Sequence, residues 1–414
     1  MNSDNNNSNT PSLRFPEFSG EWEEKKLGDV ANKQNKRNRN LQVTRVLTNS
    51  ANAGVVDQSD YFDRDIAVKG NTANYHIVEL DDFVYNPRIS TAAPVGPISI
   101  NKVGRGIMSP LYTIFRFHTG CIPFYEQYFQ TTNWHPYLKS IANFGARFDR
   151  MNITSEGFFD MPLLLPTLAE QETIAGCLKA LDELIAAQGQ KVEALKERKR
   201  GLMQQLFPQP GETTPRLRFP GFTGDWQEKK FNDFTFASGK KNKQNLPYER
   251  YSISNEMGFY PQSDQFESGG GYLKDINLSM YIIVSPHSFA YNPARINVGS
   301  IGYQNLDKDV IVSSLYEVFK TTSDCDDMFL WHWFHTGAFR KMVLDVQEGG
   351  VRQYFYYDKL RECTLNLPAI AEQQKIAECL SALDGLISAE SDKLESLRAH
   401  KRGLMQQLFP QPSK

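Results

Sequence analysis

Several features that define other classes of protein are absent from this chain of 414 residues. Its five cysteines are odd in number and form no CxxC pair, which argues against a disulfide framework and against a zinc knuckle. No run of about 18 apolar residues occurs, so we expect no transmembrane helix. Residues 1–12 are polar and lack the apolar core of a secretory signal, and we expect a disordered tail there. Together these absences predict a soluble protein of a reducing, cytoplasmic compartment.

Charge and cofactor motifs are equally sparse. The formal net charge is only -2, so any nucleic-acid site must be a local basic patch. Neither GxGxxG nor GxxxxGK[ST] occurs, which removes the usual glycine loops for dinucleotides and nucleoside triphosphates. His332 and His335 stand three apart, but the first half has no equivalent pair, so we expect packing and not metal binding. We assign no catalytic, cofactor-binding or metal-binding residue.

What the sequence does contain is a long internal duplication. The segment LRFPEFSGEWEEKKLGD at 13–29 returns as LRFPGFTGDWQEKKFND at 217–233. Likewise AEQETIAGCLKALDELI at 169–185 returns as AEQQKIAECLSALDGLI at 371–387. Between these segments the halves agree only in fragments, such as YNPRI and YNPARI. The end segments of each half are similar and the central segments differ, which predicts two similar domains that bind two different ligands in the same manner. The repeat also predicts that residues 13–27 lie beside the end of the second helix, as residues 217–231 follow the first.

Each repeat ends in a heptad pattern that predicts a long helix. A helix from about Ala169 to Phe207 would be roughly 55 to 60 Å long. Polar residues at equivalent seam positions, Lys199 and Lys401, are of the kind that sets helix register. We expect the two helices to pack antiparallel, although an ordinary amphipathic pair with no measuring role stays open. The apolar seam positions are Ile174, Leu178, Leu181, Ile185, Val192, Leu195, Ile376, Leu380, Leu383, Ile387, Leu394 and Leu397.

The predicted fold class is α+β, with two similar mixed α/β domains separated by two long antiparallel coiled-coil helices in a pseudo-twofold repeat. Short strands in hairpin-like pairs are expected at 75–87 and 280–293, and helices at 123–132 and 327–343. The expected boundaries are a tail at 1–12, a first domain at 13–166, a helix at 167–208, a linker at 209–216, a second domain at 217–368 and a helix at 369–410.

Basic and amide side chains gather at matching points of the two halves. NKQNKRNRN at 32–40 corresponds to SGKKNKQN at 238–245. Arginine and lysine neutralise phosphates, and asparagine and glutamine bond adenine, so these loops are candidates for a DNA surface. A solvated polar loop and internal salt bridges remain the alternatives. The DNA-binding candidates, including arginines beside tight or glycine-containing turns, are Lys33, Lys36, Arg37, Arg39, Arg88, Arg147, Lys240, Lys241, Lys243, Arg295 and Arg352.

The repeated motifs resemble those of the type I restriction-modification specificity subunits over nearly the whole chain. They are LRFPxFxGxWxEKK, the helix entries PLLLPTLAEQETIA and LNLPAIAEQQKIA, and the closing KRGLMQQLFPQ. The resemblance implies two target-recognition domains, each reading half of a split site in double-stranded DNA, with the helices as a ruler between them. It also implies a non-catalytic chain that docks two methyltransferase subunits and restriction subunits, with S-adenosylmethionine, ATP and Mg in those partners.

Two other functions remain open from the residues alone. The chain is a coiled-coil scaffold if its globular halves bind protein and not DNA, which its near-neutral charge favours. A self-sufficient nuclease or methyltransferase is the third hypothesis, and the missing cofactor loops speak against it.

Overall fold

A computed structural model describes residues 9–61, 72–143, 149–209, 211–254, 258–262, 277–347 and 354–410. The chain forms two compact units. The first unit comprises Met1–Gln188 and Lys393–Lys414, and the second comprises Gly189–Asp392. Among the described residues, none of the helices combines the length and apolar character that a membrane span needs.

The first unit is built on a four-stranded antiparallel sheet in the order β2-β9-β6-β7, with two-stranded sheets β1-β10, β3-β4 and β5-β8 around it. Its strands are β1 (Glu23–Lys26), β2 (Ala31–Lys33), β3 (Leu47–Ser50), β4 (Gly54–Asp57), β5 (His76–Val78), β6 (Phe83–Tyr85), β7 (Ile98–Ile100), β8 (Gly106–Met108), β9 (Thr113–Phe117) and β10 (Pro162–Leu165). Its helices are α1 (Leu27–Val30), α2 (Gln58–Tyr61), α3 (Ile122–Gln130), α4 (His135–Ile141), α5 (Ser155–Phe159) and the first half of α6 (Leu168–Leu206).

The second unit repeats this topology. Its four-stranded sheet has the order β12-β20-β17-β18, beside sheets β13-β16-β19, β14-β15 and β11-β21. The strands are β11 (Gln227–Lys230), β12 (Thr235–Ala237), β13 (Lys240–Lys241), β14 (Tyr251–Ser254), β15 (Gly258–Pro261), β16 (Ile282–Val284), β17 (Ser288–Tyr291), β18 (Ile301–Gln304), β19 (Val310–Val312), β20 (Glu317–Thr321) and β21 (Thr364–Leu367). The helices are α7 (Phe231–Phe234), α8 (Asp327–Phe334), α9 (Gly337–Gln347), α10 (Tyr357–Glu362), the second half of α6 and the first half of α11 (Ile370–Leu408). The second half of α11 belongs to the first unit. The predicted fold class and duplication are therefore confirmed.

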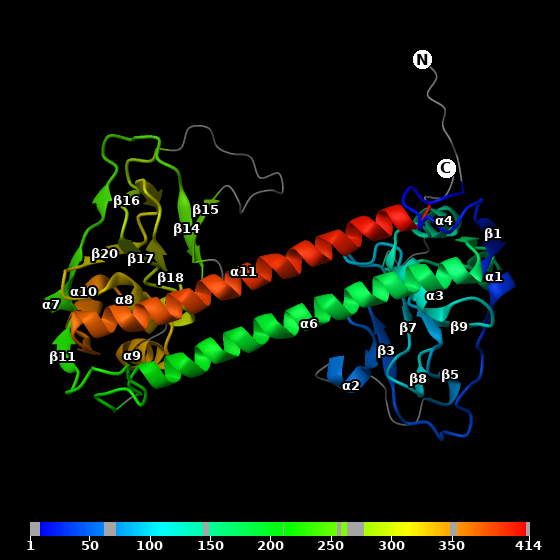
Figure 1. Ribbon diagram of the computed structural model, residues 1–414, viewed down its shortest axis with the longest axis horizontal. Coiled ribbons are helices and arrows are strands. Elements are labelled where there is room, and N and C mark those ends of the chain that lie inside the picture. The colour runs from blue at the N-terminus through cyan, green and yellow to red at the C-terminus, as the bar shows by residue number, and fades with distance from the viewer. Residues whose placement is uncertain are drawn as a thin grey trace, which may run out of the picture. The chain divides into compact units, whose positions relative to one another are not determined.

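Aromatic side chains make up much of the core of each unit. Phe83 and Phe115 of the first sheet pack against α3 and, with it, against the start of α6. Phe289 and Phe319 hold the same places in the second unit, against α8 and the start of α11. Figure 1 shows α3 beside β7 and β9, and α8 and α10 beside β17 and β20. Each sheet thus rests on a long helix through one layer of short helices.

Within each unit the two long helices run antiparallel, as the heptads predict. In the first unit Asp182 of α6 binds Lys401 of α11 at 2.6 Å, while the start of α6 packs beside the end of α11. In the second unit Lys199 binds Asp384 at 2.5 Å and Lys191 binds Glu390 at 2.5 Å. The structure buries the seam residues Ile174, Leu178, Val192, Ile376, Leu380, Leu383 and Leu394. It half-buries Leu181, Ile185, Leu195, Ile387 and Leu397.

The repeated motifs meet one another at the start of each long helix. Arg14 binds the buried carboxylate of Glu170 at 2.7 Å, and Arg218 binds Glu372 at 2.7 Å. The arginine of LRFP therefore contacts the glutamate of AEQ in both units. The Leu13 N–H donates to the carbonyl of Gln407 at 3.1 Å, which confirms that the N-terminal motif lies beside the end of α11.

Two expectations about local structure were wrong. Residues 75–87 hold β5 and β6, and 280–293 hold β16 and β17, but neither pair forms a hairpin. The chain passes from one sheet to another between them, through Asp81 and His287, whose φ angles are 64° and 60°. The helix expected at 327–343 breaks into α8 and α9, because the Thr336 hydroxyl accepts from the Phe339 N–H and caps a new helix.

Candidate nucleic-acid interface

A buried asparagine pins the basic loop of each unit. In the first unit Asn38 is 2% exposed, and its amide donates to the Val43 carbonyl at 2.8 Å and accepts from the Val43 N–H at 3.2 Å. In the second, Asn242 makes the same pair of bonds to Leu246, at 2.8 and 3.0 Å. These asparagines are therefore structural and are not free to read bases.

Three basic residues of each loop stand at the same positions relative to this asparagine. We call Lys36, Arg37 and Arg39 the first basic triad, and Lys240, Lys241 and Lys243 the second basic triad. All six side chains are exposed. None takes part in the ion pairs found among the described residues, whereas Arg45 and Arg116 each bind an aspartate. The triads thus hold positive charge that no acidic side chain of the described chain neutralises.

Lys33 differs from the other candidates of its loop. Its ammonium donates to the Ser155 hydroxyl at 3.0 Å, and the second unit has Ala237 at the matching place. Nearby, burial and then the charges of Arg37 and Lys33 lower the pKa of His76. The charge of the loop at neutral pH therefore comes from lysine and arginine.

A second surface forms at the YNP turn of the first unit. Met151 donates its N–H to the Pro87 carbonyl at 2.9 Å, and Ile89 donates its N–H to the Asp149 carbonyl at 3.1 Å, so residues 149–151 lie against the turn. This pairing brings the exposed Arg88 opposite the half-buried Arg150 in a β-bridge. The Asn86 side chain accepts from the Arg88 N–H at 3.1 Å and holds the turn.

The second unit builds the corresponding surface from other residues. Phe355 donates its N–H to the Pro293 carbonyl at 3.0 Å, the counterpart of the bond between Met151 and Pro87. The exposed Arg295 follows this turn. Beside it, Tyr354 and Tyr356 are 42% and 49% exposed.

The sequence-based candidates therefore divide into two groups. The triads, Lys33, Arg88 and Arg295 lie among the described residues, in loops or at the strands β2 and β13. Arg147 and Arg352 lie outside the described residues. Sequence reasoning missed Arg150, Tyr354 and Tyr356. Aligning the two halves from the retained β10 and β21 segments backwards would have drawn attention to them, because they lie within the few residues before α5 and α10.

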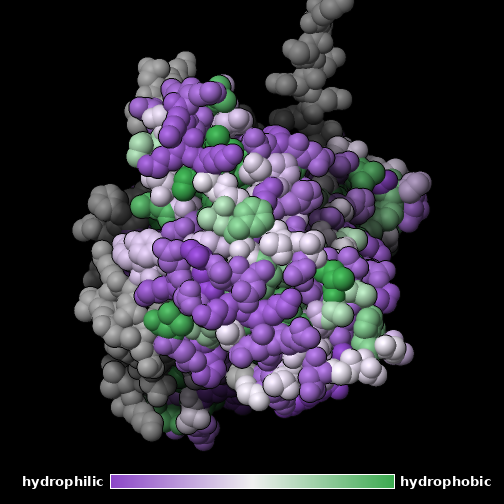
Figure 2. All heavy atoms as spheres, turned by 90° about the vertical axis from the view of Figure 1, so that its left-hand side faces the viewer, coloured by the Kyte–Doolittle hydropathy of each residue, from purple (hydrophilic) through white to green (hydrophobic). Residues whose placement is uncertain are grey.

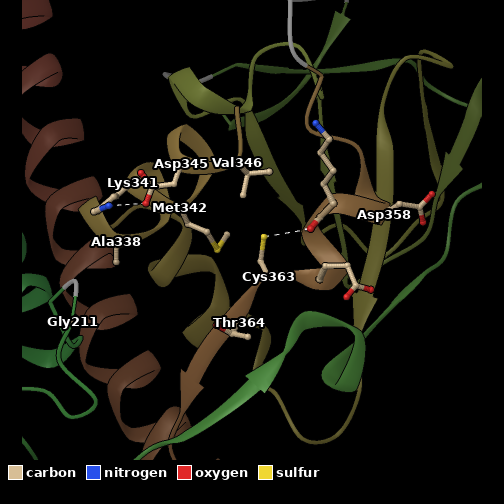
Figure 3. Close-up of a pocket in the computed structure, with 11 residues that line it drawn as sticks. Gly211, Ala338, Lys341, Met342, Asp345, Val346, Asp358, Cys363 and Thr364 are labelled. Atoms are coloured by element: carbon tan, nitrogen blue, oxygen red, sulfur yellow. Dashed lines mark hydrogen bonds and ion pairs between the residues drawn. The ribbon is translucent and has the colours of Figure 1, made fainter. Parts of the chain in front are cut away.

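One pocket, of about 800 Å³, opens in the second unit between α9, α10 and Gly211 (Figure 3). Most of its charged side chains are paired, as Lys341 binds Asp345 at 2.6 Å and Glu362 binds Lys230 at 2.9 Å. Burial raises the pKa of the Cys363 thiol, which disfavours a nucleophilic thiolate. Within the described ranges no cluster of three or more histidine, cysteine, aspartate or glutamate side chains is arranged to hold a metal ion.

On the face shown in Figure 2, apolar side chains occur mainly in small groups. The face shown in Figure 2 is covered largely by hydrophilic residues, with separate patches of hydrophobic ones. A few exposed apolar residues on a protein surface are ordinary, so only those with an organised arrangement call for a functional explanation.

Comparison with protein-family models matches residues 19–197 and 224–399 to the type I restriction modification DNA specificity domain. The chain belongs to that family. It carries the domain once in each half, in agreement with the repeated topology.

Individual relatives are distant. The chain is 25% identical over 276 residues to the specificity subunit of the type I restriction enzyme MjaVIII from Methanocaldococcus jannaschii. That match covers 61% of this chain and 62% of the relative, so the chain spans about three fifths of its length.

Solved structures extend the likeness of fold to almost the full length. The S subunit of a type I restriction-modification system from M. genitalium has a TM-score of 0.56 at 12% identity, covering 97% of this chain and 99% of its own. A chain from a structural study of complex assembly and conformational transition in a type I R-M system has a TM-score of 0.55 at 13% identity, covering 95% and 98%. At such identities these structures support the fold of the specificity family.

Proposed function

We propose that this chain is the DNA-sequence-specificity subunit of a type I restriction-modification complex and reads a bipartite site, one half-site with each unit. The observation that carries the proposal is the pair of basic triads, held in the same register by Asn38 and Asn242 on two copies of one fold. Unneutralised lysine and arginine on a pinned loop are suited to phosphate oxygens.

The internal duplication helps to divide the proposed DNA contacts into backbone contacts and base contacts. The triads share their charge and their register in the two units. A shared feature cannot distinguish two different half-sites, so we assign the triads to the DNA backbone. Features that differ, such as Arg88 with Arg150 in one unit and Arg295 with two tyrosines in the other, read the bases. Arginine at such a turn fits guanine O6 and N7.

The long helices present a repeated surface for partner subunits. We call Ala180, Leu184 and Ala187 on α6, with Ala382, Leu386 and Ala389 on α11, the apolar stripes. Their spacing puts each set on one helix face, and all six residues are exposed. Leu184 and Leu386 are 49% and 44% exposed. Two equal stripes fit two copies of one partner, the methyltransferase subunit, with restriction subunits joining that assembly.

The chemistry of the complex belongs to those partners in this proposal. S-adenosylmethionine, ATP and Mg are bound by methyltransferase and restriction subunits, and this chain supplies recognition. Each long helix has 39 residues, about 58 Å at 1.5 Å per residue, and sets the spacing between half-sites. A heptad inserted beside Gln188 and its α11 counterpart should change the spacer and leave both half-site sequences unaltered.

The deciding experiment is co-expression with the methyltransferase subunit of the same host, followed by sequencing of methylated genomic sites. We expect a bipartite motif with a fixed gap that depends on this chain. Exchanging residues 13–166 for another recognition domain should change one half of the motif only. Absence of both a complex and dependent methylation would favour the scaffold function.

Docking is tested separately with Leu184→Glu and Leu386→Glu. Each substitution puts a charge on one stripe, so each should reduce the bound methyltransferase subunits from two to one, measured by native mass spectrometry. Glu193→Lys, also on an exposed helix position but off the stripe, is the matched control. Two bound subunits in both leucine variants would rule out the stripes as the docking surface.

A further inference from the structure

Tyr354 and Tyr356 form an organised aromatic surface on the second unit. Between them Phe355 is fully buried and bonded to the Pro293 carbonyl. Side chains alternate along an extended segment, so burial of Phe355 turns both tyrosines outward. Their rings lie 5.5 Å apart between centroids at 21°, stacked on each other. The pair is an exposed aromatic plate beside the turn that carries Arg295.

The side chain of the second tyrosine contributes no cap bond to the fold. Tyr356 is the N-cap residue of α10 and makes no side-chain cap bond. In the first unit the N-cap of α5 is Thr154, whose hydroxyl accepts from the Gly157 N–H at 3.1 Å. Threonine is a favoured N-cap because it satisfies a free helix N–H, and tyrosine lacks that ability. A half-exposed tyrosine that makes no cap bond is therefore available for a role outside the fold.

This plate also lies where the two units differ. The bonds of Met151 to Pro87 and of Phe355 to Pro293 are equivalent, which makes Arg150 the counterpart of Tyr354. One unit thus offers a guanidinium and the other an aromatic ring at the same point. If positions that differ between the two units read the bases, this position is one of them.

We infer that the Tyr354–Tyr356 plate recognises thymine in the half-site read by the second unit; this inference rests on the proposed function. In the major groove the thymine C5-methyl is the apolar group that base edges present, and an aromatic surface gains by covering it. Among the described residues neither tyrosine hydroxyl has a hydrogen-bond partner, so both can face water or phosphate.

The test compares thymine with uracil, which lacks only this methyl group. The half of the motif that stays unchanged when residues 13–166 are exchanged belongs to the second unit. Duplexes carrying uracil at each thymine of that half are titrated against the complex of this chain with its methyltransferase subunits. We expect a loss of affinity of roughly four-fold for each contacted methyl, from the transfer free energy of one buried carbon.

The Tyr354→Ser/Tyr356→Thr variant should bind thymine and uracil duplexes equally. It should fold at least as well as the parent, because threonine restores the cap seen at Thr154. Tyr61→Ser, a 46% exposed tyrosine of the first unit, is the control and should keep the uracil sensitivity of the second half-site.

Three results would overturn the inference: a second half-site without any A·T pair, equal binding of thymine and uracil by the parent complex, or a variant that no longer binds methyltransferase subunits. The last would assign the plate to a protein partner. Failure of the proposed function looks different, since alanine substitution of both basic triads would then leave DNA binding unchanged.

Discussion

The start of each long helix is built alike in the two units, whereas the loops beside the YNP turns are not. Glu170 and Glu372 bind Arg14 and Arg218 at the same distance of 2.7 Å. Across the turns the residues change, from Arg150 in one unit to Tyr354 in the other. What is retained is the attachment of a recognition domain to its helix, and what has diverged faces outward. Under the proposed function, the duplication thus separates residues that support the frame from residues that select the DNA.

One buried contact departs from this rule. On α3, Gln127 donates to Asp182 at 3.0 Å, in the site where Lys401 also binds that carboxylate. The corresponding residue of α8 is His332, 1% exposed, which contacts the Ser381 hydroxyl at 3.1 Å. An amide has been exchanged for a titratable ring at an otherwise similar joint between three helices.

The largest effect is expected from breaking the retained joints. Glu170→Ala and Glu372→Ala each leave a partly buried arginine without its carboxylate, at a cost of about 3–5 kcal/mol. The costs should be similar because the contacts with arginine are the same, although Glu170 also accepts from the Trp22 indole N–H at 3.3 Å and its variant should lose slightly more. Shifts in the urea midpoint measure both costs. Asp160→Ala removes the exposed partner of Lys26 and should change the midpoint little. A clear inequality between the two glutamate variants would show that the joints are not equivalent.

Next in size is the removal of the basic triads. Alanine at Lys36, Arg37 and Arg39 should lower DNA affinity by tens-fold at moderate salt and reduce the salt slope by about 0.9 for each phosphate that the loop no longer neutralises. The second triad should give the same change, and neither should alter the sequence of the methylated motif. Titrations of duplex DNA over a range of salt concentrations supply both quantities. A changed motif would move the triads from backbone contact to base reading.

Acid should destabilise the second unit more than the first, because of His332. Burial, and then Lys199, lower its pKa from 6.5 to about 4, against an opposing effect of Asp384. The unfolded chain therefore binds the proton more readily between these values. The stability contributed by the neutral ring is complete above about pH 6.5 and is lost as the pH falls toward 4, and the loss amounts to about 2 kcal/mol at pH 5.

Hydrogen exchange at α8 compared with α3, measured at pH 7 and pH 5, checks this expectation. After correction for the intrinsic pH dependence of exchange, α8 should lose protection and α3 should not. His332→Gln introduces the side chain of the first unit and should remove the difference. If the variant keeps the acid sensitivity, another group, such as the neighbouring His335, is responsible.

The sequence predicts the large features because they repeat. Heptad spacing places a helix at about 169–207, and the structure has α6 at Leu168–Leu206. The matched loops 32–40 and 238–245 contain both basic triads. These patterns are local or duplicated, so one chain is enough to see them.

Contacts between distant segments could not be predicted in the same way. Nothing in LRFP or AEQ alone indicates that Arg14 reaches Glu170, because the bond depends on how β1 and β10 bring the segments together. The sequence predicts a hairpin at 75–87, whereas the chain passes from one sheet to another at Asp81. The reason is similar, since alternating apolar residues do not specify a partner strand. Arg150 became visible only through its bridge to Arg88.

The smallest expected effect concerns the caps of α5 and α10, and it tests whether Tyr356 is retained at the expense of the helix. Thr154→Ala removes a cap bond and should destabilise α5 by about 1 kcal/mol, or roughly five-fold in its amide exchange rate. Tyr356→Ala removes no cap bond and should leave exchange in α10 nearly unchanged. An equal loss of exchange protection in α5 and α10 would mean that the Tyr356 ring stabilises its own unit by packing. The comparison of the two N-caps would then no longer support a role for Tyr356 in binding DNA.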